Sequence, residues 1–365
     1  MRMDATYVAW TPDVEQWEPD EEAVVERVVA AMARANKLVF DKHRHATRDA
    51  HAKSHGVLRA ELRVEPGLPE HLRQGMFAQP TTYDAIVRLS SDHGDLRSDQ
   101  LQTHRGMAIK VLGVEGPRVM ADDGHSQDFL LVNRATLPFG TVHDYAKLQL
   151  ILENQPRKSD ALMRAQGLAA RSLAAALTRA GREVPAAVQT QVAPHVHLLG
   201  ETYHSMAAIG FGAHIAKISA APGSASVRAL TGRPIDRWGG PSVLRDDVVR
   251  FFRDHDADYD LRAQLCTDLE TMPVEDASVL WDEQRSPQQR VAVLHVPAQE
   301  AYSDDRRRYV DDVLSFDPWH AIEAHRPLGG IMRSRKRAYE VSRDFRYAAN
   351  GVQPREPSSI DELPD

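Results

Sequence analysis

The sequence has 365 residues, of which 42% are hydrophobic and 27% charged, and its 45 basic and 52 acidic side chains give a formal net charge of −7. This mildly acidic balance argues against a nucleic-acid-binding or membrane-surface protein. The single cysteine, Cys266, excludes an internal disulfide, a cysteine-based zinc finger and an iron–sulfur cluster. No apolar run is long enough to span a membrane, and the first residues lack the apolar centre of a signal peptide. We therefore expect a cytoplasmic protein.

Helical and strand patterns occur in separate blocks along the chain. Apolar residues at helical spacing predict helices over 21–40, 159–182 and 333–346. Alternating or continuous apolar runs predict strands within 57–64, 83–91, 106–113, 127–133, 205–219, 259–269 and 290–298. The Gly-, Pro- and Ser-rich residues 221–242 are typical of a surface connection, and we expect the polar residues 353–365 to be disordered. This arrangement predicts an α+β fold on an antiparallel sheet or barrel.

The stretch DKHRHATRDAHAKSHG contains four histidines and invites two interpretations. His51 and His55 lie four residues apart, the spacing at which two imidazoles on one helix face can share a zinc ion. However, no glutamate of the HExxH type and no third ligand lies nearby, and the residues that follow alternate as a strand. A solvated polar loop is the other interpretation.

The helical segment GGIMRSRKRAYEVSRDFRY places three polar side chains on one face. Tyr339 follows Arg335 by one helical turn, and Arg346 follows Arg335 by about three turns. A guanidinium beside a tyrosine favours the phenolate and is expected to lower its pKa. Tyrosinate is a known axial ligand of haem iron. The alternative is a basic surface helix whose tyrosine packs on the core.

Two strands carry further candidates. Arg88 and Ser90 are two residues apart and therefore share one face of their strand. Asn133 ends the strand QDFLLVN. Alone, each position is compatible with an ordinary solvated arginine or a turn asparagine.

Taken together and in order, four segments resemble the haem catalase family and its smaller catalase-related members. They are RDAHAKSHG (48–56), VRLS (87–90) followed by HRGMAIKVLG, DFLLVN (128–133), and the run from SFDPWH into RSRKRAYEVSRDFR. The resemblance covers roughly residues 40–146 and 289–346. It implies an antiparallel eight-stranded β-barrel with flanking helices.

The resemblance also implies roles for individual residues. Tyr339 would be the proximal ligand of the iron in a b-type haem, and Arg335 would keep it ionised. His51 would act as general acid and base on the distal side, Asn133 would bind the peroxide, and Ser90 would orient the imidazole. Arg48, Arg88 and Arg346 would pair with the haem propionates.

Departures from the family pattern bear on the activity. The sequence is shorter than typical catalases, and residues 147–288 match them poorly, so we expect no nicotinamide site. This favours a haem peroxidase that uses hydrogen peroxide or organic hydroperoxides and a small organic reductant, with weak catalase activity. A fatty-acid hydroperoxide lyase or isomerase, similar to allene oxide synthase, and a non-enzymatic haem-binding protein are the alternatives.

We expect residues 1–352 to form a single haem domain. It would contain a helical N-terminal arm at 20–40, the barrel at about 56–300 and the proximal haem helix at 332–347. We expect a monomer or homodimer without nucleic-acid partners.

Overall fold

The computed structural model describes residues 6–121, 124–189 and 191–365. Its helices are α1 (Glu21–His43), α2 (Val142–Leu152), α3 (Asp160–Arg179), α4 (Ala186–Gln189), α5 (Ala225–Arg228), α6 (Val243–Asp254), α7 (Asp304–Arg308) and α8 (Gly330–Asn350). Its strands are β1 (Lys53–Val64), β2 (Thr82–Ser91), β3 (Arg105–Leu112), β4 (Ser126–Val132), β5 (Tyr203–His204), β6 (Ile209–Phe211), β7 (His214–Pro222), β8 (Ala257–Leu265) and β9 (Gln289–Val296). A π-helical turn, Tyr309–Val313, follows α7.

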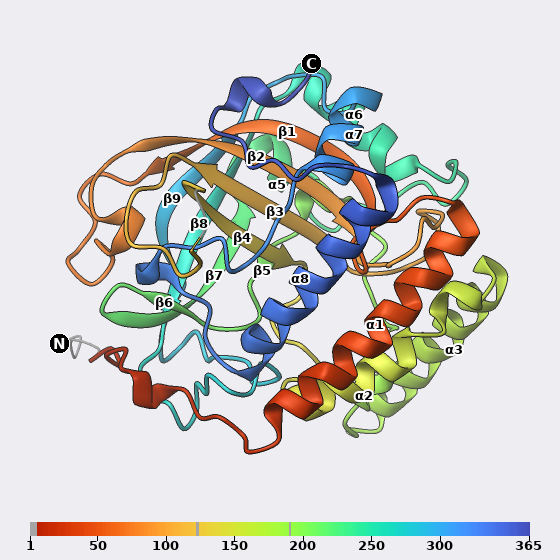
Figure 1. Ribbon diagram of the computed structural model, residues 1–365, viewed down its shortest axis with the longest axis horizontal. Coiled ribbons are helices and arrows are strands. Elements are labelled where there is room, and N and C mark those ends of the chain that lie inside the picture. Colours follow the sequence, from red (N-terminus) through yellow and green to blue (C-terminus); the bar gives the residue numbers. More distant parts are fainter. Residues whose placement is uncertain (1–5, 122–123, 190) are drawn as a thin grey trace.

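An antiparallel barrel forms the centre of the molecule (Figure 1). The strands follow the order β5-β4-β3-β2-β1-β9-β8-β7, and β5 also pairs with β7, which closes the ring. Within the described residues the ring therefore contains eight strands, and β6 is attached outside it as the hairpin partner of β7. The predicted eight-stranded antiparallel barrel in an α+β fold is confirmed.

The period-two pattern explains how the strands divide their two faces. In β2, Val87 and Leu89 are buried in the main hydrophobic cluster that fills the barrel, while Arg88 and Ser90 point to the outer face. The same alternation places Met107 of β3 and Leu131 of β4 in that cluster. The outer face of β2, β3 and β4 is thus free to present polar side chains to the helices.

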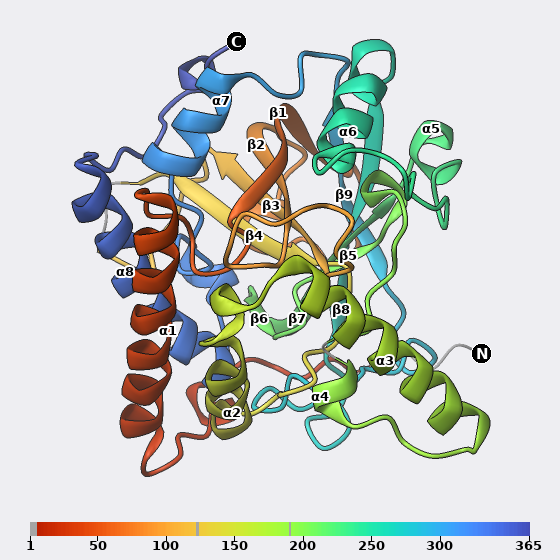
Figure 2. The same ribbon diagram turned by 90° about the vertical axis from the view of Figure 1, so that its right-hand side faces the viewer.

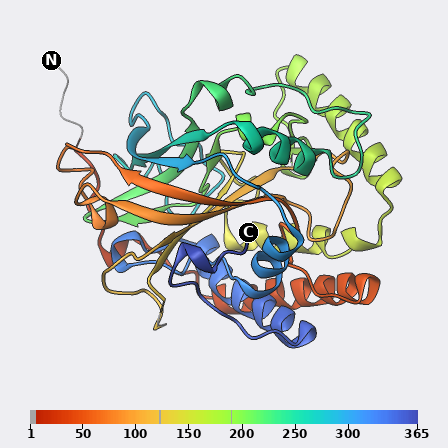
Figure 3. The same ribbon diagram turned by 90° about the horizontal axis from the view of Figure 1, so that it is seen from above.

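Helices α1 and α8 lie side by side against one side of the barrel, as all three ribbon views show (Figures 1, 2 and 3). The buried stripe of α1, which includes Val28 and Met32, packs with Ala338 of α8. Helix α8 ends at Gly351, whose φ of 64° is the left-handed conformation that glycine adopts without strain. Helices α2 and α3 continue this helical layer beyond α1.

Residues 353–365 are not disordered, contrary to our prediction. Leu363 is fully buried in a cluster with Val310 and Leu314, and the carbonyl of Pro364 accepts a hydrogen bond from Arg306. Composition alone misses this contact because a single leucine anchors an otherwise polar segment. The predicted surface connection 221–242 contains the short helix α5.

Among the described residues, no helix has the length and apolar character needed to cross a bilayer.

Candidate active site

A cavity of about 750 Å³ lies between the outer face of β2–β4 and the helical layer. Strand residues such as Gly106 line it from one side, and α8 lines it from the other. Seven of the eight residues predicted for the site line this one cavity, namely Arg48, His51, Arg88, Ser90, Arg335, Tyr339 and Arg346. Residues that lie far apart in the sequence, from three of the four motifs, therefore meet at one cavity.

Tyr339 and Arg335 form a direct pair on α8. One guanidinium nitrogen of Arg335 donates a 2.8 Å hydrogen bond to the Tyr339 hydroxyl, as the one-turn spacing predicts. Burial nevertheless raises the pKa of Tyr339 above its ordinary value, and the charge of Arg335 only opposes this shift. Our expectation of a lowered pKa is wrong for the chain without a bound group, because desolvation outweighs one cation.

Arg48, Arg88 and Arg346 meet around the π-helical turn. Arg48 and Arg346 both donate to the carbonyl of Asp311, and Arg48 and Arg88 both bond its carboxylate. Burial lowers the pKa of Arg48 well below its ordinary value, and repulsion from Arg88 and Arg346 adds to this. The cluster holds three guanidinium groups against the one carboxylate of Asp311, and thus carries excess positive charge on the cavity wall.

His51 lies in the segment between α1 and β1, and its backbone is strained. Its φ is 56°, a conformation that non-glycine residues adopt only when their surroundings require it. The imidazole Nδ1 lies 3.0 Å from the Ser90 hydroxyl. The ring rests against β3 at Gly106, where an added Cβ would come within 2.6 Å of the imidazole. Glycine is therefore required there if the ring is to keep this position.

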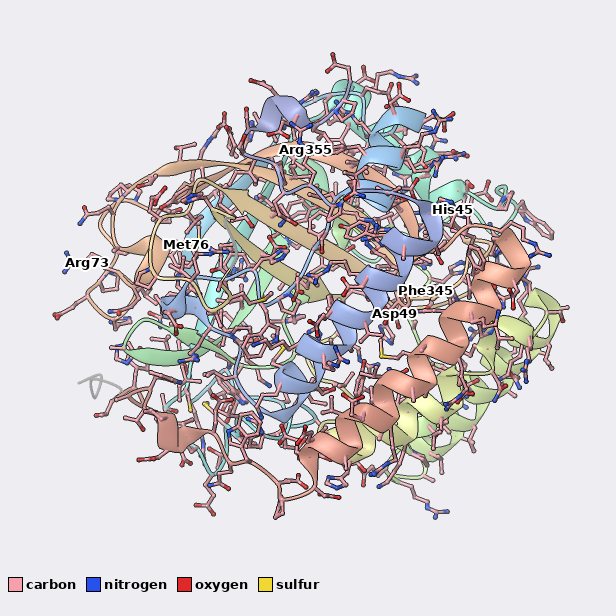
Figure 4. All side chains as sticks on the ribbon, viewed as in Figure 1. His45, Asp49, Arg73, Met76, Phe345 and Arg355 are labelled. Atoms are coloured by element: carbon pink, nitrogen blue, oxygen red, sulfur yellow. The ribbon has the colours of Figure 1, made fainter. Side chains whose placement is uncertain are left out.

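The segment that carries His51 is tied to the helix that carries Tyr339. The Ser342 hydroxyl of α8 donates a 2.9 Å hydrogen bond to the Asp49 carboxylate. Figure 4 shows Asp49 and Phe345 where α8 faces α1, and Phe345 makes an edge-to-face contact with Phe40 of α1. These contacts fix the two sides of the cavity relative to each other.

Asn133 does not line the cavity, and its side chain is used elsewhere. Its carbonyl oxygen accepts a 2.7 Å hydrogen bond from the Arg105 backbone, and its amide donates a 2.7 Å bond to Glu201. These two hydrogen bonds, with the Arg105 main chain and the Glu201 carboxylate, hold the end of β4 in place. The prediction that Asn133 binds the peroxide is not supported by this placement, and the next residue, Arg134, lines the cavity instead.

The alternative zinc site at His51 and His55 is also not supported. His55 is fully buried within β1 and lies 2.7 Å from the Ser91 hydroxyl. His51 precedes this strand, so the two imidazoles have different surroundings. Within the part of the chain that the structure describes, the only cluster of three or more His, Cys, Asp or Glu side chains close enough to share a metal ion comprises Glu18, Asp20 and His143 at the surface, and it includes neither His51 nor His55.

Comparison with solved structures identifies the architecture. A fungal catalase structure matches at a TM-score of 0.59 and 15% identity, covering 94% of this chain and 66% of that one. Catalase A from Saccharomyces cerevisiae gives a TM-score of 0.59 at 12% identity, covering 94% of this chain and 68% of that chain. A bacterial catalase gives 0.59 at 11% identity, covering 98% and 67%. The chain has the catalase fold. It spans about two thirds of the length of these structures.

Sequence comparison does not add to this result. No family model matches the sequence. No curated protein matches it either. The likeness to catalases is therefore visible in the three-dimensional arrangement and in the four short motifs.

Among the cavity-lining residues that we did not predict, three lie close to the predicted ones in the fold: Asp92, Gly106 and Arg134. Asp92 directly follows β2, and Arg134 is the second residue after β4. Beyond the end of a strand, the alternation no longer indicates which way a side chain points. Gly106, at the start of β3, carries a sequence signal, since glycine inside a strand often permits a close approach of another group.

Proposed function

We propose that the protein is a haem-dependent peroxidase that reduces hydrogen peroxide or organic hydroperoxides with electrons from a small organic reductant. It would also have weak catalase activity. The observation that carries this proposal is the shared cavity of Tyr339, held by Arg335, and His51, held by Ser90. The catalase fold supports it.

The charges on the cavity wall fit a haem. Arg48 and Arg88 pair with one carboxylate, that of Asp311, while Arg346 donates to main-chain carbonyls of the same turn. Burial acts to raise the pKa of Asp311, but Arg88 and Arg48 lower it. Buried charge without a partner is costly, so an excess of two cations favours a ligand with two carboxylates. The two propionates of a b-type haem meet this requirement. The Tyr339 hydroxyl would supply an oxygen ligand for the iron, and Arg335 would stabilise its anionic form.

Bound haem would supply the two electrons that break the peroxide O–O bond and would recover them from the reductant. The chain supplies the proton chemistry. The imidazole of His51 would accept the peroxide proton and then donate it to the departing oxygen. The Ser90 hydroxyl, 3.0 Å from Nδ1, orients the ring for both transfers.

The outer wall of the cavity favours a peroxidase over a strict catalase. Helices α2 and α3 contribute apolar residues to it, among them Leu148, Met163 and Leu168. Leu168 is 59% exposed, so this wall opens to solvent and gives an organic reductant an apolar approach. A narrow channel would instead admit only the peroxide.

Haem titration of the protein and of Tyr339→Phe tests the proposal. The wild type should bind one haem and oxidise an aromatic dye with peroxide faster than it releases oxygen. Tyr339→Phe should lose most of its haem and its activity, because phenylalanine offers no ligand oxygen. Tyr83→Phe is the matched control, since its hydroxyl bonds the Met76 carbonyl away from the cavity. Wild-type protein that takes up no haem, or a Tyr339→Phe variant with the wild-type spectrum, would refute the proposal.

A further inference from the structure

The carboxylate of Asp92 lies next to the second ring nitrogen of His51. Asp92 Oδ1 is 3.4 Å from His51 Nε2, while Nδ1 on the other side of the ring faces the Ser90 hydroxyl at 3.0 Å. The backbone strengthens the arrangement, because the amide of His51 donates a 3.3 Å hydrogen bond to the carbonyl of Asp92. Asp92 therefore contacts His51 through both its main chain and its side chain, and both residues line the cavity.

The loop that carries Asp92 is itself fixed. The amide of Asp92 donates a 3.0 Å hydrogen bond to the carbonyl of His104, just before β3. An added Cβ at Gly94 would lie 2.0 Å from the Asp49 carbonyl, so this loop packs directly on the segment that carries His51. The backbones of the two segments are thus held against each other, and this places the Asp92 side chain, 45% exposed, within reach of the imidazole.

The charges around His51 leave Asp92 as its acidic partner. Burial lowers the pKa of His51, Asp92 acts to raise it, and Arg88 of β2, Arg335 of α8 and Arg48 before β1 act to lower it. Without a carboxylate, an imidazole beside three guanidinium groups would rarely hold a proton near pH 7.

The charged groups around Asp92 also indicate that it pairs with His51. Burial lowers the pKa of His93 and of His104 to about 4, so both neighbours are neutral near pH 7. Arg134 and Arg105 are the cations on which the Asp92 charge acts, and the Nε of Arg134 is buried without a hydrogen-bond partner in the described structure. Asp92 therefore interacts with two permanent cations and with one group, His51, that can gain a proton.

We propose that Asp92 is a positioning residue that forms a carboxylate–imidazole pair with His51 and thereby lets His51 hold the peroxide proton between its two transfers. The inference rests on the proposed function. The proton leaves the peroxide hydroxyl for Nε2 of His51, and the imidazolium that forms is paired with the Asp92 carboxylate. The same proton then passes to the departing oxygen, so His51 and Asp92 end the cycle as they began it.

The first experiment measures the pKa of His51 by NMR in the full-length protein without added haem. The ring resonance of His51 is assigned by its absence in His51→Gln. Two unit charges 3.4 Å apart attract each other only moderately at a partly hydrated site. Asp92→Asn removes this attraction and should therefore lower the pKa of His51 by about 1. Asp92→Glu, which keeps the charge, should restore most of the difference. Asp41→Asn is the control, because this exposed residue of α1 pairs with Lys37 and alters only the net charge.

The second experiment follows the peroxide reaction of the haem-loaded protein against pH by stopped flow. The midpoint of its rise with pH should move down by the same amount, about 1, in Asp92→Asn. A merely structural role would lower the rate at every pH and leave the midpoint in place.

The outcomes separate this inference from the proposed function. An unchanged pKa of His51 in Asp92→Asn, in protein that binds haem, would overturn the pair alone. The expected shift in protein that binds no haem would overturn the proposed function, and with it the part that the pair plays there.

Discussion

Gly106→Ala is the sharpest test of the distal geometry, because it adds one methyl group where the His51 ring lies. The new Cβ would lie 2.6 Å from both Cε1 and Nδ1 of His51 and 2.9 Å from the Ser90 hydroxyl. An ordinary contact between such atoms is about 3.5 Å, so the ring must move by about 1 Å. Such a movement lengthens the 3.0 Å contact between Nδ1 and Ser90 beyond hydrogen-bonding distance.

The expected effect is large on reactivity and modest on stability. A misplacement of about 1 Å costs about 10²-fold in a reaction that depends on a positioned acid–base group. Overpacking of this kind destabilises a fold by about 1–3 kcal/mol. Haem retention should stay close to wild type, because Tyr339 and Arg335 lie on α8 and not on β3.

Stopped-flow measurement of the peroxide reaction, together with urea unfolding, checks both values. Gly240→Ala is the matched control, since no atom lies within 4 Å of the Cβ added there. A folded Gly106→Ala protein with the wild-type peroxide rate would show that the imidazole does not rest on β3, and the distal assignment would fail with it.

Two further predictions concern stability. His325 accepts a hydrogen bond from the Met76 amide, and burial lowers its pKa to about 4, below its ordinary value of 6.5. Because the folded pKa is the lower one, stability is full above pH 6.5 and falls towards pH 4 by up to about 1.4 kcal/mol per pH unit. In His325→Gln this slope, measured by urea unfolding, should flatten, and an equal slope would contradict the reasoning. Leu363→Ala should destabilise the protein by about 2–5 kcal/mol and speed proteolysis within 353–365, whereas a change under about 0.5 kcal/mol would show that Leu363 is not a core residue.

Most of the barrel could be predicted from the sequence because its strands alternate. In β1, Leu58, Leu62 and Val64 face the interior, and such a period is visible without any tertiary information. Helix α6 was not predicted, although Val248, Phe251 and Phe252 form its buried side, because it is short and directly follows the Gly- and Pro-rich connection. No prediction covered α2, whose apolar residues are partly exposed and follow no clear stripe.

In the candidate site, too, the direction of a side chain could be predicted within regular elements and not in loops. Residues inside a regular element, such as Tyr339 in α8 or Ser90 in β2, could be assigned because helix and strand geometry fix their direction. Asn133 and Arg134 could not be told apart, because β4 ends at Val132 and strand geometry no longer fixes the direction of either side chain. Asp92 could not be foreseen, because its distance to His51 depends on how two loops pack.

The order of strands in the ring has a consequence for how the protein folds. The strands β1 to β4 pair as consecutive neighbours, and so do β7 to β9, so each half can form from contacts that are local in the chain. The halves join through the two-residue β5 and through β1 with β9, where Glu61 meets His295 from the other end of the chain. Closing such a long loop is slow and carries a large entropic cost. His51 belongs to the first half, but Tyr339 lies beyond the second. The cavity can therefore form only after α8 has packed against the first half, and the rate at which the protein becomes able to bind its ligand should follow this long-range contact and not the formation of the helix itself.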